Sequence, residues 1–324
     1  MVRFSIVVPL FNKAEFVVDT VNSILAQAIG DLEVIVVDDG STDGGVQRLA
    51  LITDPRLKIL RQSNSGVSMA RNVGISNARG MFVSFLDADD LWAVNHLSIV
   101  EDLINSDPKA IAWATGYTEF DQTQCLGEIM RRVPQINVAS RRFDQNDFMS
   151  AWSRFPFFCT DSITVRASTL KAMQPCFPQG ERLAEDQDLW FRLSELGAIR
   201  FFDVRDTVFY RRHVNDSLTT ICVLEPLPAF VRLANRACRQ SGNAKKAAHL
   251  LYGTHLLHVA WNNCKAGKRA VALRFLFQVR PDVRWTYWVR IFICLLLPVF
   301  FVRAGLLFAR RFDRLLKSRF KAGS

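Results

Sequence analysis

Residues 1–120 alternate between short apolar runs rich in β-branched residues and stretches with a helical spacing of apolar positions. The runs predict strands at 4–8, 33–37, 57–60, 81–86 and 110–115, and the stretches between them predict helices at 14–27, 45–52, 67–78 and 95–104. This alternation indicates βαβ units and a largely parallel, Rossmann-like α/β sheet. The strands are apolar on both faces, as a sheet covered by helices on both sides requires.

The pattern is less regular over residues 121–220. We expect a strand pair near 116–131 that projects from the sheet, a helix at 185–196 and extended chain at 200–210. Residues 226–280 predict two or three helices, with breaks near Gly242 and Gly267. The chain therefore divides into an α/β domain at 1–220, a helical extension at 221–282 and a basic, apolar tail at 283–324.

Charge is distributed unevenly along the 324 residues, whose formal net charge is +10. Residues 265–324 contain 14 Lys and Arg against Asp282 and Asp313, so that the rest of the chain is slightly acidic. A basic tail on a slightly acidic body argues against a nucleic-acid-binding domain. It favours contact between the tail and an anionic surface, most simply phospholipid.

The apolar run of the tail, residues 291–302, is shorter than the roughly 20 residues that a single membrane span needs. From Arg303 onward, a helix would align basic residues on one stripe and Phe and Leu residues on the opposite side. This pattern predicts an amphipathic helix in the membrane interface. A true span and a buried C-terminal helix are the alternatives.

The seven cysteines are odd in number and form no CxxC pair, which favours reduced thiols over disulfides or a zinc site. The chain runs from Met1 directly into the first predicted strand, without the pattern of a signal peptide. We therefore expect the protein on the cytoplasmic side of the plasma (inner) membrane, as a peripheral or monotopic protein.

Polar residues follow the predicted strands at the edge where open α/β sheets bind ligands. Phe11 and Asn12 follow the first strand, residues 38–43 (DDGSTD) the second, and residues 87–90 (DADD) the fourth. Asp87 and Asp89 are hard oxygen ligands that suit Mg²⁺ or Mn²⁺, which in turn bind a diphosphate. Helix capping is the alternative role for this group. The chain has neither GxGxxG after the first strand nor GxxxxGK[ST], which disfavours dinucleotide dehydrogenases and P-loop enzymes.

Four motifs occur in a fixed order: SIVVPLFN at 5–12, VVDDGSTD at 36–43, NSGVSMARN at 64–72 and FLDADD at 85–90. Together they resemble the inverting glycosyltransferases of family 2, which have the GT-A fold, over roughly residues 3–215. The resemblance implies that Asp39 binds the nucleobase and that Phe11, where the family often has Tyr, lines or stacks on it. Pro9 belongs to the same nucleotide-binding set. The resemblance also implies Asp87 near the ribose or the metal, and Asp89 as the metal ligand that holds the diphosphate.

Arg71 lies on a predicted helix whose packed face is formed by Ala70, Val73, Gly74 and Asn77. This arrangement leaves Arg71 and Asn72 free to face the cleft, and we expect Arg71 to bind the nucleotide. A surface ion pair is the alternative for Arg71.

An inverting transfer needs a general base that deprotonates the acceptor hydroxyl. The segment 185–190 (EDQDLW) resembles the acidic pair that the family has before an apolar helix. Asp188 lies four residues before Arg192, and we expect both on a solvated polar face together with Glu185. Asp186 points with the buried Leu189 and Trp190, so we predict Asp186 as the catalytic base, with helix capping as the alternative.

His213 follows the acidic helix as a similar His does in many relatives, which implies a metal or diphosphate ligand, although a single His is often structural. The stretch lacks the QxxRW pattern of processive synthases, which favours transfer of one sugar per encounter. A final group is aromatic and suits either core packing or stacking on an acceptor sugar: Trp152, Phe155, Phe157 and Phe158.

The sequence therefore predicts a metal-dependent glycosyltransferase that uses Mn²⁺ or Mg²⁺. The expected donor is a nucleotide-diphospho-sugar, by resemblance a UDP-sugar, and the expected acceptor is a glycan or lipid-linked glycan of cell-surface polysaccharide biosynthesis. A sugar nucleotidyltransferase and a catalytically silent carbohydrate-binding protein of the same fold are the alternatives.

Overall fold

The computed structural model describes residues 2–121, 127, 129, 135–154, 156–212, 222–280 and 283–296. The chain divides into two compact units, Met1–Thr220 and Ile221–Ser324.

The first unit is built on a sheet that has eight strands in the described part of the chain, in the order β3-β2-β1-β4-β9-β6-β10-β8. Their bounds are Leu57–Arg61, Leu32–Asp38, Phe4–Leu10, Phe82–Phe85, Ile163–Arg166, Ala112–Thr115, Ile199–Arg205 and Gln135–Phe143. The sheet is mainly parallel: β9 runs antiparallel to β4 and β6, and β8 runs antiparallel to β10. A smaller sheet pairs β5 (Leu91–Trp92) with β11 (Val208–Arg211) and β11 with β7 (Thr118–Phe120).

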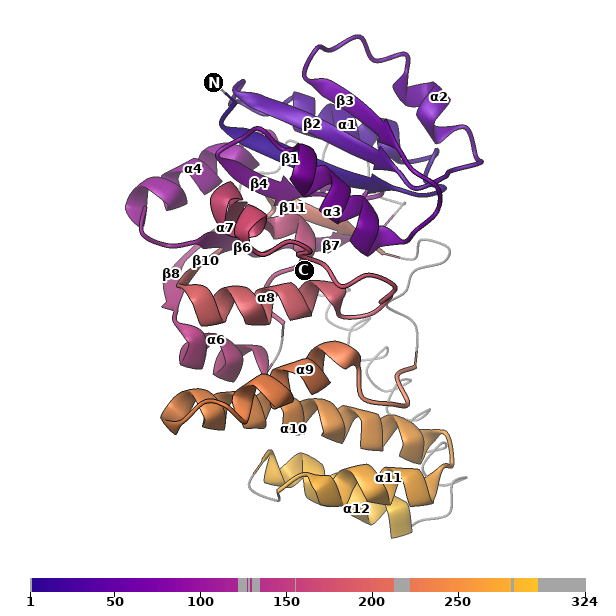
Figure 1. The fold of residues 1–324 in the computed structure, drawn as a ribbon, viewed down its shortest axis with the longest axis vertical. Helices are drawn as coiled ribbons and strands as arrows, with labels where there is room; N and C mark the ends of the chain where they lie inside the picture. Colours follow the sequence, from indigo (N-terminus) through magenta and orange to yellow (C-terminus); the bar gives the residue numbers. More distant parts are fainter. Residues whose placement is uncertain are drawn as a thin grey trace, which may run out of the picture. The chain divides into compact units, whose positions relative to one another are not determined.

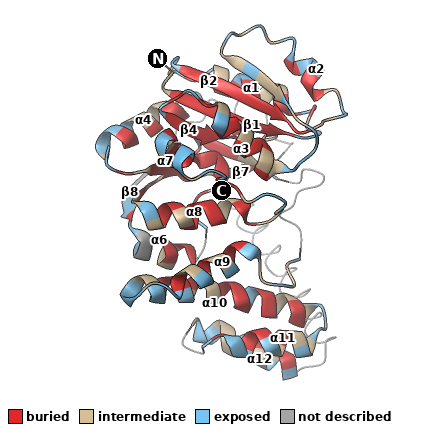
Figure 2. Ribbon diagram, in the orientation of Figure 1, coloured by how far each residue is buried: buried red, intermediate tan, exposed pale blue. Residues whose placement is uncertain are grey.

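Helices cover both faces of the large sheet, as the apolar strands predicted (Figure 1). On one face, α1 (Val17–Leu25) and α4 (His96–Ser106) share a core with Ile6 and Val8 of β1. On the other face, α3 (Val67–Asn77) packs so closely on β1 that a Cβ on Gly74 would lie 2.3 Å from Val7 Cγ1. Residues of one strand alternate between its faces, so β1 is buried throughout (Figure 2).

The remaining helices of this unit are α2 (Gly45–Leu49), α6 (Gln145–Trp152), the 3₁₀ helix η1 (Thr160–Ser162), α7 (Ala167–Ala172) and α8 (Glu185–Leu196). The mainly parallel α/β fold predicted from the sequence is confirmed, and α8 has the predicted bounds. The predicted extended segment at 200–210 forms two strands, β10 and β11. Of the strand pair expected near 116–131, the described residues contain β7, and most of the remainder lies outside them.

Pro9 lies inside β1 rather than after it, because β1 extends to Leu10. Proline lacks the N–H that a central strand donates to its neighbour. The pairing of β1 with β4 ends at Val7 and Phe85, and Val7 faces β4, since its carbonyl accepts the N–H of Leu86. Pro9 faces the same side two residues later, where β4 has ended, so no ladder hydrogen bond is lost.

The second unit contains α9 (Pro228–Ala237), α10 (Gly242–Lys265), α11 (Arg269–Gln278) and α12 (Trp285–Leu296). Its core lies between α10, α11 and α12, where Ile291 and Leu295 of α12 are buried. The helices predicted over 226–280 are therefore confirmed. None of the helices in the described ranges has the length and apolar character of a membrane span. The amphipathic helix predicted from Arg303 onward lies outside the described residues.

Candidate active site

Polar loops converge at the carboxyl edge of the parallel strands. The loops after β1 and β2 are joined there, because Asn12 N–H donates to Ser41 Oγ at 3.1 Å and Thr42 N–H donates to Asn12 Oδ1 at 2.9 Å. The loop after β4 carries Asp87–Asp90. Since β9 is antiparallel to β4, its amino end and the preceding η1 lie at this same edge. The edge predicted from the strand pattern is therefore the edge at which these side chains meet.

Arg71 links three parts of the chain at this edge. Its guanidinium donates to Asp87 Oδ1 at 2.8 Å and to Glu185 Oε1 at 2.9 Å, and its Cζ lies 5.3 Å from the ring centroid of Phe177. The side chain is only 4% exposed. Burial lowers the pKa of Arg71, but Asp87 and Glu185 outweigh it and raise the pKa further above its usual value, so Arg71 is a fixed positive charge.

Asn72 does not face the cleft, which corrects the sequence expectation. Its side chain is buried and exchanges two hydrogen bonds with the backbone of Phe177, at 2.8 and 2.9 Å. Asn72 therefore holds the segment whose aromatic ring packs on Arg71.

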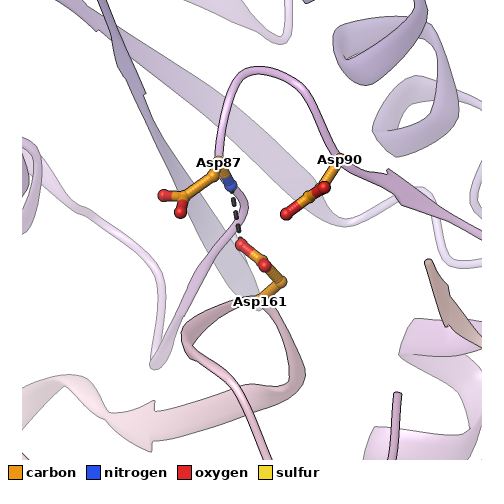
Figure 3. A group of neighbouring side chains, drawn as sticks. All are labelled: Asp87, Asp90 and Asp161. Carbon is orange, nitrogen blue, oxygen red and sulfur yellow. Dashed lines mark hydrogen bonds between the residues drawn. The ribbon is translucent and has the colours of Figure 1, made fainter. Parts of the chain in front are cut away.

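Three carboxylates, those of Asp87, Asp90 and Asp161, form a group in which one oxygen of each lies within 4.8 Å of the others (Figure 3). Asp161 Oδ1 accepts the Asp87 N–H at 2.7 Å, and Asp90 Oδ1 accepts the Arg211 N–H at 2.6 Å. Asp90 and Asp161 are buried, whereas the Asp87 side chain is 33% exposed. The group is therefore reached from solvent on the side of Asp87.

Burial sets the protonation of this group. Burial, with the neighbouring carboxylates of Asp161 and Asp89, raises the pKa of Asp90 well above its ordinary value. Burial and the carboxylate of Asp87 raise the pKa of Asp161 to about 7. The donors fit a divalent cation, because carboxylate oxygens are the ligands that Mg²⁺ and Mn²⁺ prefer. Metal binding here must release protons, since a ligating carboxylate is deprotonated.

Asp186 lies in the first turn of α8 and is half-buried. Its Oδ2 accepts the Thr160 hydroxyl at 3.0 Å, and its Oδ1 accepts the Gln187 N–H at 2.7 Å. Burial raises the pKa of Asp186, and the effects of Arg71 and of the two hydrogen bonds lower it by less. A raised pKa and partial access to solvent are the properties that a general base requires.

The two other acids of α8 are more buried than the sequence predicted. Asp188 pairs with Arg192 at 2.9 Å, as expected from the spacing, but its side chain is only 4% exposed. Glu185 is also buried, on Arg71. Burial and, to a smaller extent, the charge of Asp186 raise the pKa of Glu185, and Arg71 lowers it by less. The expectation that both lie on a solvated face was wrong, because Arg71 covers Glu185 from a helix 114 residues earlier.

Asp39 is buried after β2 and organises the next loop. Its carboxylate accepts hydrogen bonds from Gln62 Nε2 at 2.7 Å, Ser65 N at 2.7 Å and Gly66 N at 2.8 Å. Gly66, the residue before α3, has φ of 90°, a conformation that favours glycine. A carboxylate has about four acceptor positions, so Asp39 keeps about one for a ligand. Its role toward a nucleobase stays a prediction.

Asp89 and Phe11 flank this region. Asp89 Oδ2 pairs with Lys13 Nζ at 2.9 Å, so Asp89 is not part of the described three-carboxylate group. Phe11 is 45% exposed, as a residue that stacks on a ligand must be. The predicted nucleotide role of Pro9, buried in β1, and the predicted metal role of Asp89 are untested. His213 lies outside the described residues.

The predicted aromatic group is largely core. Trp152 and Phe158 are buried and contact each other, with ring centroids 4.8 Å apart. Trp152 Nε1–H also donates to Gln187 Oε1 at 3.1 Å, which ties α6 to α8 beside Asp186. Phe157 is half-buried, and Phe155 lies outside the described residues.

Sequence reasoning did not find Asp161, Thr160 or Lys13 as members of the site. Asp161 and Thr160 lie in an irregular stretch without apolar periodicity, and their position depends on the insertion of β9 between β4 and β6. The pattern of a polar Cys-Thr-Asp-Ser turn (159–162) before an apolar strand was the available signal.

The family model for "Glycosyl transferase family 2" matches residues 5–166, half of the chain. A glycosyltransferase of Nostoc sp. is 37% identical over 217 residues, which are 65% of each chain. One of Rickettsia typhi is 28% identical over 71% of this chain and 69% of its own length. The chain spans about a third of the first curated relatives that it matches, since it covers 32% of the Rickettsia conorii and Rickettsia felis proteins.

Two solved structures share the fold. S. aureus TarS 1–349 in complex with UDP-GlcNAc matches with a TM-score of 0.66 at 21% identity, over 87% of this chain and 82% of TarS. Mannosyltransferase PcManGT from Pyrobaculum calidifontis, in complex with GDP-Man and Mn²⁺, matches with a TM-score of 0.50 at 21% identity, over 90% and 85%.

The order of the sheet and the structural match define the GT-A fold, with an acidic group at the carboxyl edge of the strands. Within this class, the chain belongs to glycosyl transferase family 2.

Proposed function

We propose that this glycosyltransferase moves a single sugar, with inversion, from a nucleotide-diphospho-sugar to a hydroxyl of a glycan or lipid-linked glycan in cell-surface polysaccharide biosynthesis. The proposed donor is a UDP-sugar. The observation that carries the proposal is the half-buried Asp186, which accepts a hydrogen bond from Thr160 at 3.0 Å. The charges of Arg71 and Asp87 both change the pKa of Asp186. TarS was solved with UDP-GlcNAc and PcManGT with GDP-Man, which supports a nucleotide-sugar donor.

In the proposed reaction, the acceptor hydroxyl oxygen attacks the anomeric carbon of the donor. The bond from that carbon to the diphosphate oxygen breaks, the nucleoside diphosphate leaves with the electron pair, and the hydroxyl proton passes to Asp186. A raised pKa makes Asp186 a better acceptor for this proton. The pKa must still lie below the working pH, because Asp186 has to be ionised before the transfer. The opposing effect of Arg71, which lowers the pKa of Asp186, supports this balance.

A divalent ion, Mn²⁺ or Mg²⁺, would neutralise the charge that develops on the leaving diphosphate. Candidate ligands are Asp87, from the three-carboxylate group, and Asp89, once released from Lys13. PcManGT was solved with Mn²⁺, which supports this choice of ion. Arg71 adds a permanent positive charge beside Asp87.

The test is Asp186→Asn, which keeps the size of the side chain and removes its basicity. We expect sugar transfer to fall by about 10²-fold or more, while UDP-sugar binding measured by calorimetry stays within about twofold of wild type. Asp102→Asn, at an exposed position of α4, is the matched control and should leave both quantities unchanged. Near-wild-type turnover in Asp186→Asn would remove Asp186 from the role of base.

The alternatives are separated by the product. A glycosyltransferase releases a nucleoside diphosphate from the donor, whereas a sugar nucleotidyltransferase releases pyrophosphate. A carbohydrate-binding protein that has lost catalysis would show neither donor hydrolysis nor transfer across a panel of nucleotide-sugars.

We also propose that the C-terminal tail binds the cytoplasmic surface of the plasma membrane. The described part of the tail supports this, because three apolar side chains of α12 are 51–69% exposed: Trp285, Ile293 and Leu296. Removal of residues 297–324 should reduce flotation with vesicles that contain anionic phosphatidylglycerol, and it spares Ile291 and Leu295 in the core. A full-length protein that stays soluble without detergent and does not float with these vesicles would contradict the proposal.

A further inference from the structure

Two adjoining cavities lie outside the carboxylate group, at the end of the sheet formed by β6, β10 and β8. Their volumes are about 670 and 370 Å³, and both are lined by Arg141, Phe143, Ala151 and Arg154. The larger one is within the range of about 300–1,000 Å³ that is typical of small-ligand sites. We call the two together the arginine cavity.

The register of the sheet explains why these side chains share one face. Arg141 of β8 lies directly opposite Phe201 of β10, and Phe143 lies two residues beyond Arg141. Opposed residues and residues two apart on a strand point to the same side of a sheet. Arg154 approaches from the turn after α6, where its N–H donates to the carbonyl of Ala151.

The charges of the arginine cavity are unevenly placed: four arginines and four acids, including Asp206, line it, but the residues common to both cavities include Arg141 and Arg154 and no acid. Several lining charges have partners: Glu119 pairs with Arg212 at 3.1 Å, Asp203 with Arg205 at 3.4 Å, and Arg142 with Asp107 at 2.8 Å. In the ranges that the structure describes, Arg141 and Arg154 have no ion pair. Asp147 is the single acid that lines the smaller cavity beside the arginines. The rim shared by the two cavities is therefore positive.

The wall beside these arginines is aromatic. The ring of Phe157 lies with its centroid 4.9 Å from those of both Phe143 and Phe201. Phe157 is half-buried and the other two are buried, so the rings hold one another in place. Aromatic faces of this kind suit the apolar face of a sugar ring.

A short segment of chain connects the arginine cavity to the proposed base. Pro156 and Phe157 line the larger cavity, and Thr160, three residues after Phe157, donates to Asp186. Tyr117 lines the same cavity. Burial raises the pKa of Tyr117, and the nearby Cys159 raises it further. In the strand order of the sheet, the cavity strands β6, β10 and β8 lie on one side of β9, and β1 and β2 lie on the other.

We infer that the arginine cavity is the acceptor subsite and that the acceptor carries a phosphate ester, bound by Arg141 and Arg154 while its sugar ring stacks on the Phe157 wall. This inference rests on the proposed function. The planar guanidinium donates two parallel hydrogen bonds to a phosphate, and two arginines without ion-pair partners in the described residues can do so without first breaking an ion pair.

The experiment compares methyl hexosides of glucose, galactose and mannose with and without a 6-phosphate, together with inorganic phosphate, by titration calorimetry in the presence of UDP. The wild type should bind at least one phosphorylated hexoside about tenfold or more tightly than its unphosphorylated form. The double variant Arg141→Gln/Arg154→Gln should reduce that preference to about twofold or less. Arg239→Gln, an exposed arginine of the second unit, removes the same type of charge and should keep the preference.

Binding of UDP in every variant confirms an intact donor site. The absence of a phosphate preference in the wild type, or its persistence in the double variant, would overturn the inference. Equal affinity for inorganic phosphate would also overturn it, because the site would then bind free phosphate rather than an acceptor. Failure of the proposed function is a different result, namely no binding or hydrolysis of any nucleotide-sugar, and it is measured without an acceptor.

Discussion

Arg71→Met removes the positive charge that holds the acidic edge together and keeps most of the apolar stem. In the variant, Asp87 and Glu185 lose their cation, and the Phe177 ring loses its contact with the guanidinium. Breaking a buried ion pair by removing one partner costs about 3–5 kcal/mol, because the other charge stays buried without compensation. Glu185 is 11% exposed at its side chain and Asp87 is 33% exposed, so most of the loss should come from Glu185.

The loss is measured by urea unfolding at pH 7, followed by tryptophan fluorescence, since Trp92, Trp113 and Trp190 are buried in the first unit. Arg212→Gln is the matched control. It breaks the exposed pair with Glu119, whose side chains are 52% and 50% exposed, and should change the free energy of unfolding by about 1 kcal/mol or less. The double variant Arg71→Met/Glu185→Gln should regain about 1–3 kcal/mol, because it removes the orphan charge.

The same reasoning gives a pH dependence with a definite sign. Without Arg71, the pKa of Glu185, already raised by burial, rises further, so the carboxyl is protonated more readily as the pH falls. The destabilisation by Arg71→Met should therefore shrink between pH 7 and pH 5. The reasoning is refuted if Arg71→Met costs no more than Arg212→Gln, or if the double variant is no more stable than the single one.

Two further predictions concern buried groups. Burial raises the pKa of Asp90, so exchanging its carboxyl for a neutral amide of the same shape should cost little. Asp90→Asn, whose Oδ1 can still accept the Arg211 N–H, should cost about 1 kcal/mol or less in urea unfolding, and Asp90→Leu, which loses that acceptor, about 1–3 kcal/mol more. Burial lowers the pKa of His96 to about 3, so the unfolded chain binds the extra proton below pH 6.5, and about 1 kcal/mol of stability is lost from pH 7 to 5.5. His96→Phe should remove that part of the pH dependence, and an unchanged pH slope would contradict the lowered pKa of His96. An equal cost of Asp90→Asn and Asp90→Leu would contradict the prediction for Asp90.

The sequence by itself determined the order and approximate bounds of the strands and helices. Strands buried on both faces have continuous apolar runs, and the helices between them have amphipathic patterns, so β1 to β4 and α1 to α4 were predicted within a few residues of their bounds. The parallel order of these strands then requires their carboxyl ends to lie at one edge, which is why the loops that carry Asp39 and Asp87 could be assigned to one site from the sequence.

Only the tertiary structure decided which charges are compensated there. Glu185 and Asp188 look solvated by helical spacing alone, yet Arg71, distant in sequence, buries Glu185. Asp161 joins the site because β9 enters the sheet antiparallel between β4 and β6, which no local pattern encodes. Pro9 is tolerated inside β1 because β4 ends two residues earlier. In each case the local sequence fixes the backbone conformation, while the energy of a buried charge or a missing hydrogen bond depends on the segment that packs against it.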